Sequence, residues 1–170
     1  MSRRILMVIA PEKFRDEEYA QPREIFDKAG IEVTVVSSRR GKAKGTYGLE
    51  VSVDKLLSEV HASDFDAVVF IGGTGSRVYV GDPEANRLIR EAETSKRLIG
   101  AICAAPGTLA ATGILKGKKA TSYIEERELL LKGGAIFTGN LVEVDGRLVT
   151  GNGPQAATAF GEKIAEMLKK

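Results

Sequence analysis

The single cysteine of this sequence, Cys103, is the side chain best suited to nucleophilic chemistry. An apolar run over 98–102 precedes it, and Ala104 and Ala105 follow it. With Ala101 two residues earlier, the pattern small-x-Cys-x-small is typical of a nucleophile elbow, a sharp strand-to-helix turn where only small flanking side chains fit. A thiol at such a turn faces the positive end of a helix, which favours the thiolate. The alternative is a buried structural cysteine, because free cysteine is among the most buried residue types.

Several other positions follow predicted strands and therefore belong to the same edge of the fold as Cys103. Ligands of open α/β sheets bind outside the carboxyl ends of the strands, so residues directly after a strand are candidates for a site. These positions are Glu18, Gly72, Gly73, Tyr123 and Asn152. We expect them to surround the thiol.

Backbone N–H groups at this edge are candidates for stabilising a developing oxyanion. Gly73 has no side chain to keep a ligand away, and its N–H together with that of Ala104 would form an oxyanion hole. The pair Gly72-Gly73 is equally compatible with a plain tight turn, because two glycines after a strand are not specific on their own.

Glu18 is the candidate proton carrier. A carboxyl group near a thiolate has a raised pKa, and in its protonated form it can donate a hydrogen bond to sulfur. A helix through this stretch would kink near Pro22, which has no N–H for the carbonyl of Glu18. The alternative is that the acidic residues 16–18 only complement the N-terminus of a helix.

Histidine, metal and nucleotide chemistry find little support in the sequence. The only histidine, His61, precedes the third predicted strand and is expected on the surface, roughly 20 Å from the functional edge. No Cys-His dyad is therefore expected within the chain. One cysteine and one histidine predict no metal site, and residues 72–76 lack the P-loop and dinucleotide-binding patterns. We expect a protein that needs no cofactor.

The composition is that of an ordinary globular protein. The 170 residues are 43% hydrophobic and 28% charged with a formal net charge of +2, which predicts one domain over residues 1–170 and no nucleic-acid partner. The densest basic cluster, residues 39–44, is interpreted as a solvated loop. No intrachain disulfide can form, and the first apolar run is too short for a signal peptide or a membrane span. We expect a cytoplasmic protein without membrane contact.

Hydrophobic patterning predicts strands that alternate with helices. Expected strands cover residues 5–10, 32–37, 67–71, 98–102 and 119–122, with a small hairpin or edge excursion over 45–53 and a hairpin with an Asp-Gly turn over 142–149. Expected helices cover residues 22–29, 83–93, 106–112, 125–131 and 156–168, the second opened by Asp82 as N-cap and the first closed by Gly30. This alternation predicts a mainly parallel sheet with helices on both faces.

Taken in order along the chain, these motifs resemble the ThiJ/PfpI superfamily, also called the DJ-one superfamily. The resemblance runs over nearly the whole chain, and its specificity comes from the combination of motifs. The motifs are Glu18-Tyr19-Ala20-Gln21-Pro22, Val69-Phe70-Ile71-Gly72-Gly73, Ala101-Ile102-Cys103-Ala104-Ala105-Pro106, Thr121-Ser122-Tyr123 and Gly151-Asn152-Gly153-Pro154.

The resemblance implies a flavodoxin-like three-layer α/β sandwich that forms homodimers or higher homo-oligomers. It also implies a nucleophilic or oxidisable Cys103 hydrogen-bonded to Glu18, with Gly73 and Ala104 as oxyanion-hole amides. The sequence departs from its relatives where they carry histidine. Pfp-type intracellular peptidases carry it directly after the cysteine, where this chain has Ala104, and glyoxalase-active relatives carry it at the place of Tyr123.

Three functions follow from these residues. The first is a cofactor-free enzyme for small reactive aldehydes, glyoxalase- or deglycase-like, in which Cys103 attacks the carbonyl and Glu18 carries the proton. Tyr123 would orient substrate or exchange protons, and Gly72 and Asn152 would line the substrate pocket. The second is an oxidative-stress sensor or chaperone-like protein with an oxidisable Cys103. The third is a Pfp-type cysteine peptidase, a hydrolase that would need a histidine from elsewhere.

Overall fold

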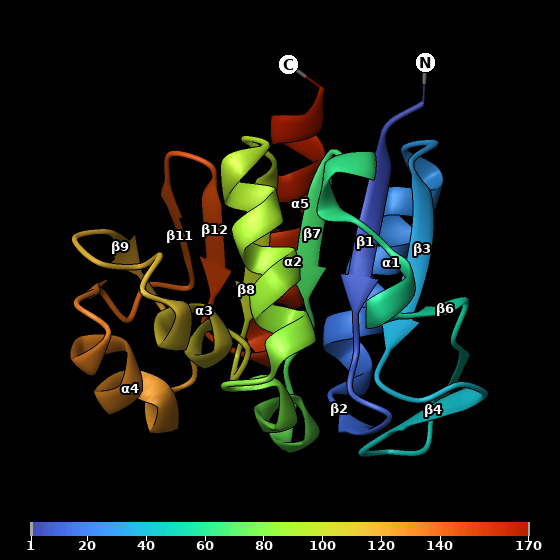
Figure 1. Ribbon diagram of the computed structural model, residues 1–170, viewed down its shortest axis with the longest axis horizontal. Helices are drawn as coiled ribbons and strands as arrows, with labels where there is room; N and C mark the ends of the chain where they lie inside the picture. Colours follow the sequence, from blue (N-terminus) through green and yellow to red (C-terminus); the bar gives the residue numbers. More distant parts are fainter. Residues whose placement is uncertain (1, 170) are drawn as a thin grey trace.

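A seven-stranded sheet in the order β11-β12-β8-β7-β1-β3-β6 forms the centre of the structure, a computed structural model that describes residues 2–169 (Figure 1). All neighbouring strands pair in parallel except β11 and β12. The carboxyl ends of the parallel strands therefore share one edge, at the bottom of Figure 1. The strands of this sheet are β1 (Arg4–Val8), β3 (Glu32–Ser37), β6 (Lys55–Leu56), β7 (Ala67–Phe70), β8 (Leu98–Ile102), β11 (Val142–Asp145) and β12 (Leu148–Gly151).

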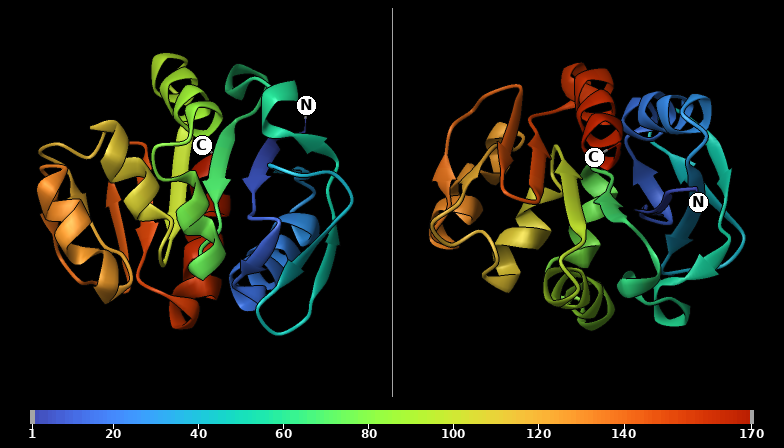
Figure 2. Two further views of the ribbon diagram at one scale, coloured as in Figure 1. Left: turned by 60° about the horizontal axis from the view of Figure 1, so that its bottom comes forward. Right: turned by 90° about the horizontal axis from the view of Figure 1, so that it is seen from above.

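Helices cover both faces of this sheet. The helices α1 (Asp16–Lys28) and α5 (Ala157–Leu168) pack against each other on one face, and α2 (Pro83–Thr94) and α3 (Pro106–Thr112) lie on the other (Figure 2). The short α4 (Arg127–Lys132) packs on α3. The 3₁₀ helices are η1 (Leu57–Glu59), η2 (Ala62–Asp64), η3 (Thr74–Tyr79), η4 (Ile124–Glu126) and η5 (Pro154–Ala156). Over residues 2–169, no helix combines the length and the apolar character that crossing a membrane requires.

The central strands are buried on both faces, as their continuous apolar runs predict. Every residue of β7 and β8 is buried, and so is β1 after its first residue. Parallel sheets need such strands because helices cover both of their faces. The prediction of a three-layer α/β sandwich is therefore confirmed. The second helix is also confirmed, since the Asp82 side chain accepts a hydrogen bond from the N–H of Ala85 at 2.9 Å.

The first helix begins earlier than the sequence analysis expects. It starts at Asp16 instead of Pro22, and Pro22 lies inside it. The three acidic residues 16–18 occupy its first turn, where the partial positive charge of a helix N-terminus stabilises them. Glu18 is thus a helix residue, and Gly30, at a φ of +74°, follows the helix end as predicted.

Two small sheets lie outside the central one. The predicted strand over 119–122 is shorter, β9 (Lys119–Ala120), and it pairs with β10 (Ile136–Phe137) instead of joining the main sheet. The basic cluster over 39–44 is only partly a loop, because β4 (Lys42–Gly45) pairs with β5 (Glu50–Ser52) in the predicted hairpin and with β2 (Glu12–Phe14). Sequence patterns missed β2 and β10 because each is only two or three residues long.

The turn of the second hairpin is shifted by one residue from its predicted place. Asp145 pairs with Leu148, so Gly146 and Arg147 form the two-residue loop in place of Asp145 and Gly146. Gly146 has a φ of +60°, and glycine at the first loop position is typical of a type II′ turn.

Phe160 of α5 supports the two strands that lead to the expected site. It is fully buried, and a Cβ placed on Gly100 of β8 would stand 3.1 Å from its ring. A Cβ on Gly151 of β12 would stand 3.3 Å from the same ring. The two glycines therefore let α5 approach the sheet closely.

Phe160→Ala is expected to lower the free energy of unfolding by about 3–5 kcal/mol, because it leaves a cavity under β8 and β12. Urea unfolding followed by circular dichroism measures this loss. Glu162→Ala, an exposed position on the same helix, is the control and should change stability by less than about 0.5 kcal/mol. Equal effects of the two substitutions would contradict this role of Phe160.

Candidate active site

Cys103 stands on a left-handed turn between β8 and α3. Its φ is +65°, a conformation that costs a residue with a side chain on the order of 1–3 kcal/mol. Two backbone hydrogen bonds hold the turn: the Cys103 N–H donates to the carbonyl of Gly151 at 2.9 Å, and its carbonyl accepts from the N–H of Tyr123 at 2.8 Å. This geometry is the predicted nucleophile elbow.

Gly72 allows Glu18 and Cys103 to meet. A Cβ on Gly72 would stand 2.6 Å from Oε1 of Glu18 and 2.7 Å from Cβ of Cys103, and it would also collide with the carbonyl oxygen of Ile102. Any larger residue would therefore push the carboxyl group and the thiol apart. Gly72 lies beneath the pair and does not line the cavity above it.

Glu18 reaches the thiol from the first turn of α1 and is completely buried. Burial raises the pKa of Glu18 to about 7, although contacts with the Cys103 thiol, Arg15 and the N–H of Gly72 act in the opposite direction. Within the described chain neither carboxyl oxygen has a hydrogen-bond partner of good geometry. A buried carboxyl group without such partners favours its neutral form. Glu18 is therefore poised to gain or lose a proton near neutral pH.

The thiol of Cys103 differs from the sequence-based expectation of a ready thiolate. Burial and the negative charge of Glu18 raise the pKa of Cys103 to about 12. The N–H groups of Gly73 and Ala104 lower this pKa, but by less. The resting group is thus a thiol, and a thiolate forms only when a neighbour takes its proton. Sequence patterns did not predict this because desolvation depends on the whole surrounding core.

The same two N–H groups are available to a ligand. Neither Gly73 nor Ala104 donates its N–H to a backbone oxygen among residues 2–169, and both residues line the cavity above the thiol. Gly73 has a φ of +101°, and a Cβ on it would stand 2.5 Å from the N of Arg15 and 2.6 Å from the O of Lys13. Only glycine fits this position, which brings the amide close to the sulfur.

The cavity above Cys103 measures about 210 Å³. Its lining residues come from six separate segments of the chain: Arg15, Thr46, Gly73, Thr74, Arg77, Cys103, Ala104, Tyr123, Glu125 and Pro154. The sequence analysis missed Arg15 and Arg77. Arg15 directly precedes α1 and Arg77 follows Gly72-Gly73 by a few residues, so their position after strand ends was the available signal.

Tyr123 and Asn152 occupy different places relative to the thiol. Tyr123 is 39% exposed and forms a wall of the Cys103 cavity. It also lines a second cavity of about 200 Å³, and Asn152 belongs to that second cavity, where it accepts a hydrogen bond from Gln155. The expectation that Asn152 lines the pocket of Cys103 is therefore not met, because Asn152 lines only this second cavity, together with Gln155.

His61 lies away from this site, as the sequence analysis expects. Its ring is exposed and lies 3.2 Å from Glu91 and 3.5 Å from Arg87, on a shallow groove beside α2. Over residues 2–169, no group of three or more histidine, cysteine or acidic side chains is arranged to hold a metal ion.

An ion pair joins η3, which follows Gly73, to η4, which follows Tyr123. Arg77 in η3 donates two hydrogen bonds to the buried carboxylate of Glu126 in η4, at 2.7 and 3.1 Å. It donates a third to the exposed Glu125 at 2.9 Å. Because η3 begins directly after Gly73 and η4 directly after Tyr123, this ion pair sets the spacing of two walls of the cavity.

The fold and the elbow define the chain as an α/β sandwich protein with a buried cysteine-glutamate pair at the carboxyl edge of its sheet. The sequence matches the model of the DJ-1/PfpI family over residues 3–167. The chain belongs to the DJ-1/PfpI family.

Individual relatives cover nearly the whole chain. The deglycase PfpI of Pyrococcus furiosus is 30% identical over 96% of this chain and 99% of its own. YraA of Bacillus subtilis, named as a candidate cysteine protease, is 32% identical over 99% of this chain and 100% of its own. The crystal structure of a ThiJ/PfpI domain protein from Brachyspira murdochii superposes with a TM-score of 0.96 at 31% identity, over 99% of this chain and 97% of that one.

Glu18→Gln is expected to make the protein more stable above neutral pH. The pKa of Glu18 lies near 7 in the folded chain and near 4.5 when unfolded, so its contribution to stability is present below pH 4.5 and is lost as pH rises through 7. This loss amounts to about 3 kcal/mol. Urea unfolding at pH 5 and pH 8 should show a smaller pH dependence in the variant than in the unaltered protein. The exposed Glu50→Gln should keep the original dependence, and an equal dependence in all three proteins would contradict the raised pKa.

Arg77→Met is expected to cost about 2 kcal/mol of stability, because it leaves the carboxylate of Glu126 buried without its partner. Glu125→Gln removes only the exposed contact and should cost less than about 1 kcal/mol. Thermal and urea unfolding of both variants, of Glu126→Gln and of Arg77→Met/Glu126→Gln measure the coupling. If the double variant is no more stable than the sum of the single losses predicts, the two side chains do not act as a pair.

Proposed function

We propose that this protein is a cofactor-free enzyme that acts on small reactive carbonyl compounds through Cys103 and Glu18, in the manner of a glyoxalase or deglycase. The observation that carries the proposal is the buried Glu18 carboxyl, with a pKa of about 7, beside a thiol that faces two available N–H groups. A base with a pKa near the working pH is the most effective general base. The family relative named as a deglycase supports the same chemistry.

In the first step, Sγ of Cys103 attacks the aldehyde carbon and Glu18 takes the thiol proton. A carbon–sulfur bond forms, and the electron pair of the C=O bond moves to oxygen. The N–H groups of Gly73 and Ala104 stabilise this oxyanion. Glu18 then returns its proton to the oxyanion, so that a neutral hemithioacetal stands on Cys103.

In the second step, a 2-oxoaldehyde rearranges on the sulfur. The Glu18 carboxylate removes the hydrogen of the first carbon as a proton, and the electron pair moves toward the neighbouring carbonyl. The hydroxyl proton of the first carbon passes to that carbonyl oxygen, and Glu18 delivers its own proton to the second carbon. The first carbon is thereby oxidised to a thioester and the second reduced to an alcohol. Water cleaves the thioester, which releases a 2-hydroxy acid and restores the thiol without any external oxidant or reductant.

The size of the cavity favours a small substrate. Its volume of about 210 Å³ lies below the range of about 300–1,000 Å³ that drug-sized ligands occupy. Tyr123 at its wall is available to orient a carbonyl or hydroxyl oxygen of the substrate. A long peptide would not fit inside this cavity, although one that lies across its mouth would still reach the thiol.

The two other hypotheses have less support. A peptidase needs a proton donor for its leaving amine, and His61 lies on the groove beside α2. An oxidation sensor needs a thiolate that peroxide can reach. Cys103 is only 8% exposed, and its pKa is raised. A gain of two oxygens on Cys103 after mild peroxide treatment would nevertheless favour the sensor.

Methylglyoxal consumption without glutathione is the direct test. Cys103→Ala and Glu18→Gln should each lower kcat/KM by a factor of about 100 or more, because each removes a group that acts in the transition state. Glu24→Gln, an exposed position on the same helix, is the control. The rate should rise with pH through about 7, since Glu18 works as the ionised base. Unchanged turnover in either site variant would overturn the mechanism.

A further inference from the structure

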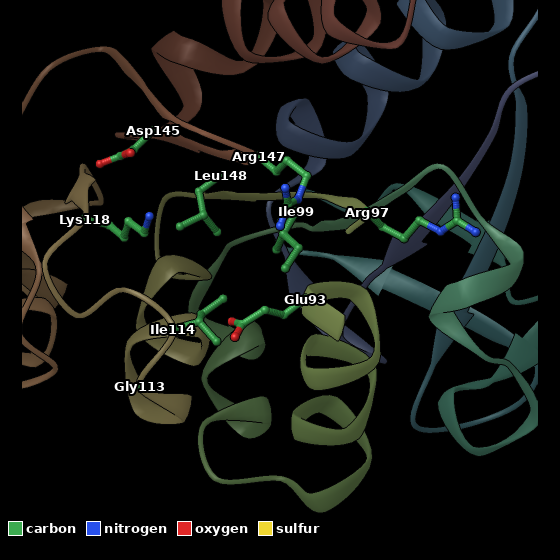
Figure 3. Close-up of a pocket in the computed structure, with 9 residues that line it drawn as sticks. All are labelled: Glu93, Arg97, Ile99, Gly113, Ile114, Lys118, Asp145, Arg147 and Leu148. Atoms are coloured by element: carbon green, nitrogen blue, oxygen red, sulfur yellow. The ribbon is translucent and has the colours of Figure 1, made fainter. Parts of the chain in front are cut away.

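A further cavity, separate from both cavities described above, lies at the edge of the sheet opposite to Cys103. It measures about 310 Å³ and opens where β8 and β12 begin and where α2 and α3 end (Figure 3). Its lining residues are Glu93, Arg97, Ile99, Gly113, Ile114, Lys118, Asp145, Arg147 and Leu148. The proposed chemistry at Cys103 uses none of them.

Aliphatic side chains form the floor of this cavity. Ile99 and Leu148 are 3% and 9% exposed, and Ile114 is half-buried. In Figure 3 the side chains of Leu148, Ile114 and Ile99 gather in the middle of the site. Such a floor favours the hydrocarbon part of a ligand, because its burial removes apolar surface from water.

Two cations at the rim have no partner of their own. Lys118 and Arg147 form no ion pair or side-chain hydrogen bond among residues 2–169. Most arginines within the same range are paired with carboxylates. In Figure 3 the ammonium group of Lys118 points toward Leu148. The rim therefore offers two free cationic donors close to an apolar floor, a combination that suits a carboxylate on a short hydrocarbon chain.

Glu93 supplies the opposite charge. It lies in the last turn of α2, has no ion pair within residues 2–169, and its carboxylate points toward Ile114 in Figure 3. The partial negative charge of the helix C-terminus adds to its field. The other two charged side chains are engaged elsewhere: Asp145 accepts from the N–H of Lys119 at 2.9 Å, and Arg97 donates to the carbonyl of Ser63 at 2.8 Å.

We propose that this cavity binds a small aliphatic α-amino acid. The carboxylate of the ligand is held by Lys118 and Arg147, its ammonium group by Glu93, and its hydrocarbon side chain covers Ile99, Ile114 and Leu148. A simple anion would stand unbalanced beside Glu93, and a simple amine beside Lys118 and Arg147. The zwitterion is the small-molecule class that satisfies both signs and the floor together.

This site is separate from the reaction at Cys103. The cavity lies at the start of β8, and the thiol follows the end of the same strand. Binding is therefore expected to persist in Cys103→Ala. That variant separates the present proposal from the proposed enzymatic function, because either can fail without the other.

Isothermal titration calorimetry with leucine, its 2-oxo acid 4-methyl-2-oxopentanoate, isopentylamine and inorganic phosphate tests the proposal on the full chain. Leucine should bind saturably at concentrations up to about 10 mM and more tightly than the other three probes. Arg147→Gln, Lys118→Gln and Glu93→Gln should each weaken leucine binding about tenfold. Arg90→Gln, another arginine without an ion pair among the described residues, is the matched control and should bind as the unaltered protein does.

Leucine binding that survives in Cys103→Ala and Arg90→Gln but weakens in the three cavity variants would support the site. Absence of saturable leucine binding would overturn it. Equal or tighter binding of the 2-oxo acid, the amine or phosphate would overturn the zwitterionic assignment. Binding lost in Cys103→Ala but unchanged in the cavity variants would place the ligand at the other edge of the sheet and also overturn the proposal.

Discussion

The left-handed backbone at Cys103 is the constraint on which the rest of the site depends. A residue with a side chain adopts a φ of +65° only when its surroundings compensate the cost. Here the carbonyl of Gly151 and the N–H of Tyr123 supply that compensation from two other segments. The turn places the thiol at the carboxyl edge of the sheet, where the N–H groups of Gly73 and Ala104 both face the sulfur. The candidate oxyanion hole is thus a consequence of the turn.

The pairing of Glu18 with Cys103 shows how one buried environment acts on two groups. Removal of water raises the pKa of the carboxyl group and of the thiol together. Both groups are therefore neutral below pH 7, and above it Glu18 is the ionised base that can take the thiol proton. This arrangement differs from a histidine-activated thiolate, in which a positive neighbour lowers the pKa of the sulfur. The chain therefore lacks a permanently reactive sulfur, and its chemistry depends on proton transfer to Glu18.

Four glycines allow the segments around the site to pack closely because they have no side chain. Gly72 leaves room for the carboxyl group and the thiol to approach each other, and Gly73 leaves room for the loop before α1. On the far side of the sheet, Gly100 and Gly151 let Phe160 come close to β8 and β12. Each of these four glycines lies within a strand or close to the end of one. Why each position requires glycine can be seen only in the tertiary structure, because the atoms that a Cβ would meet belong mainly to other segments of the chain.

Local patterns in the sequence determined most of the fold and the identity of the central residues. The buried runs of β1, β7 and β8, the Asp82 cap and the small-x-Cys-x-small elbow all depend on residues close in sequence, and all appear as predicted. Short strands such as β10 escaped prediction, and the first helix began earlier, because pairing partners and helix-end charges compete there with weak local signals. The roles of Arg15 and Arg77, the displacement of Asn152 and the protonation of Cys103 were decided only by the tertiary structure. Desolvation and cavity shape are sums over segments distant in the chain, so no local pattern contains them.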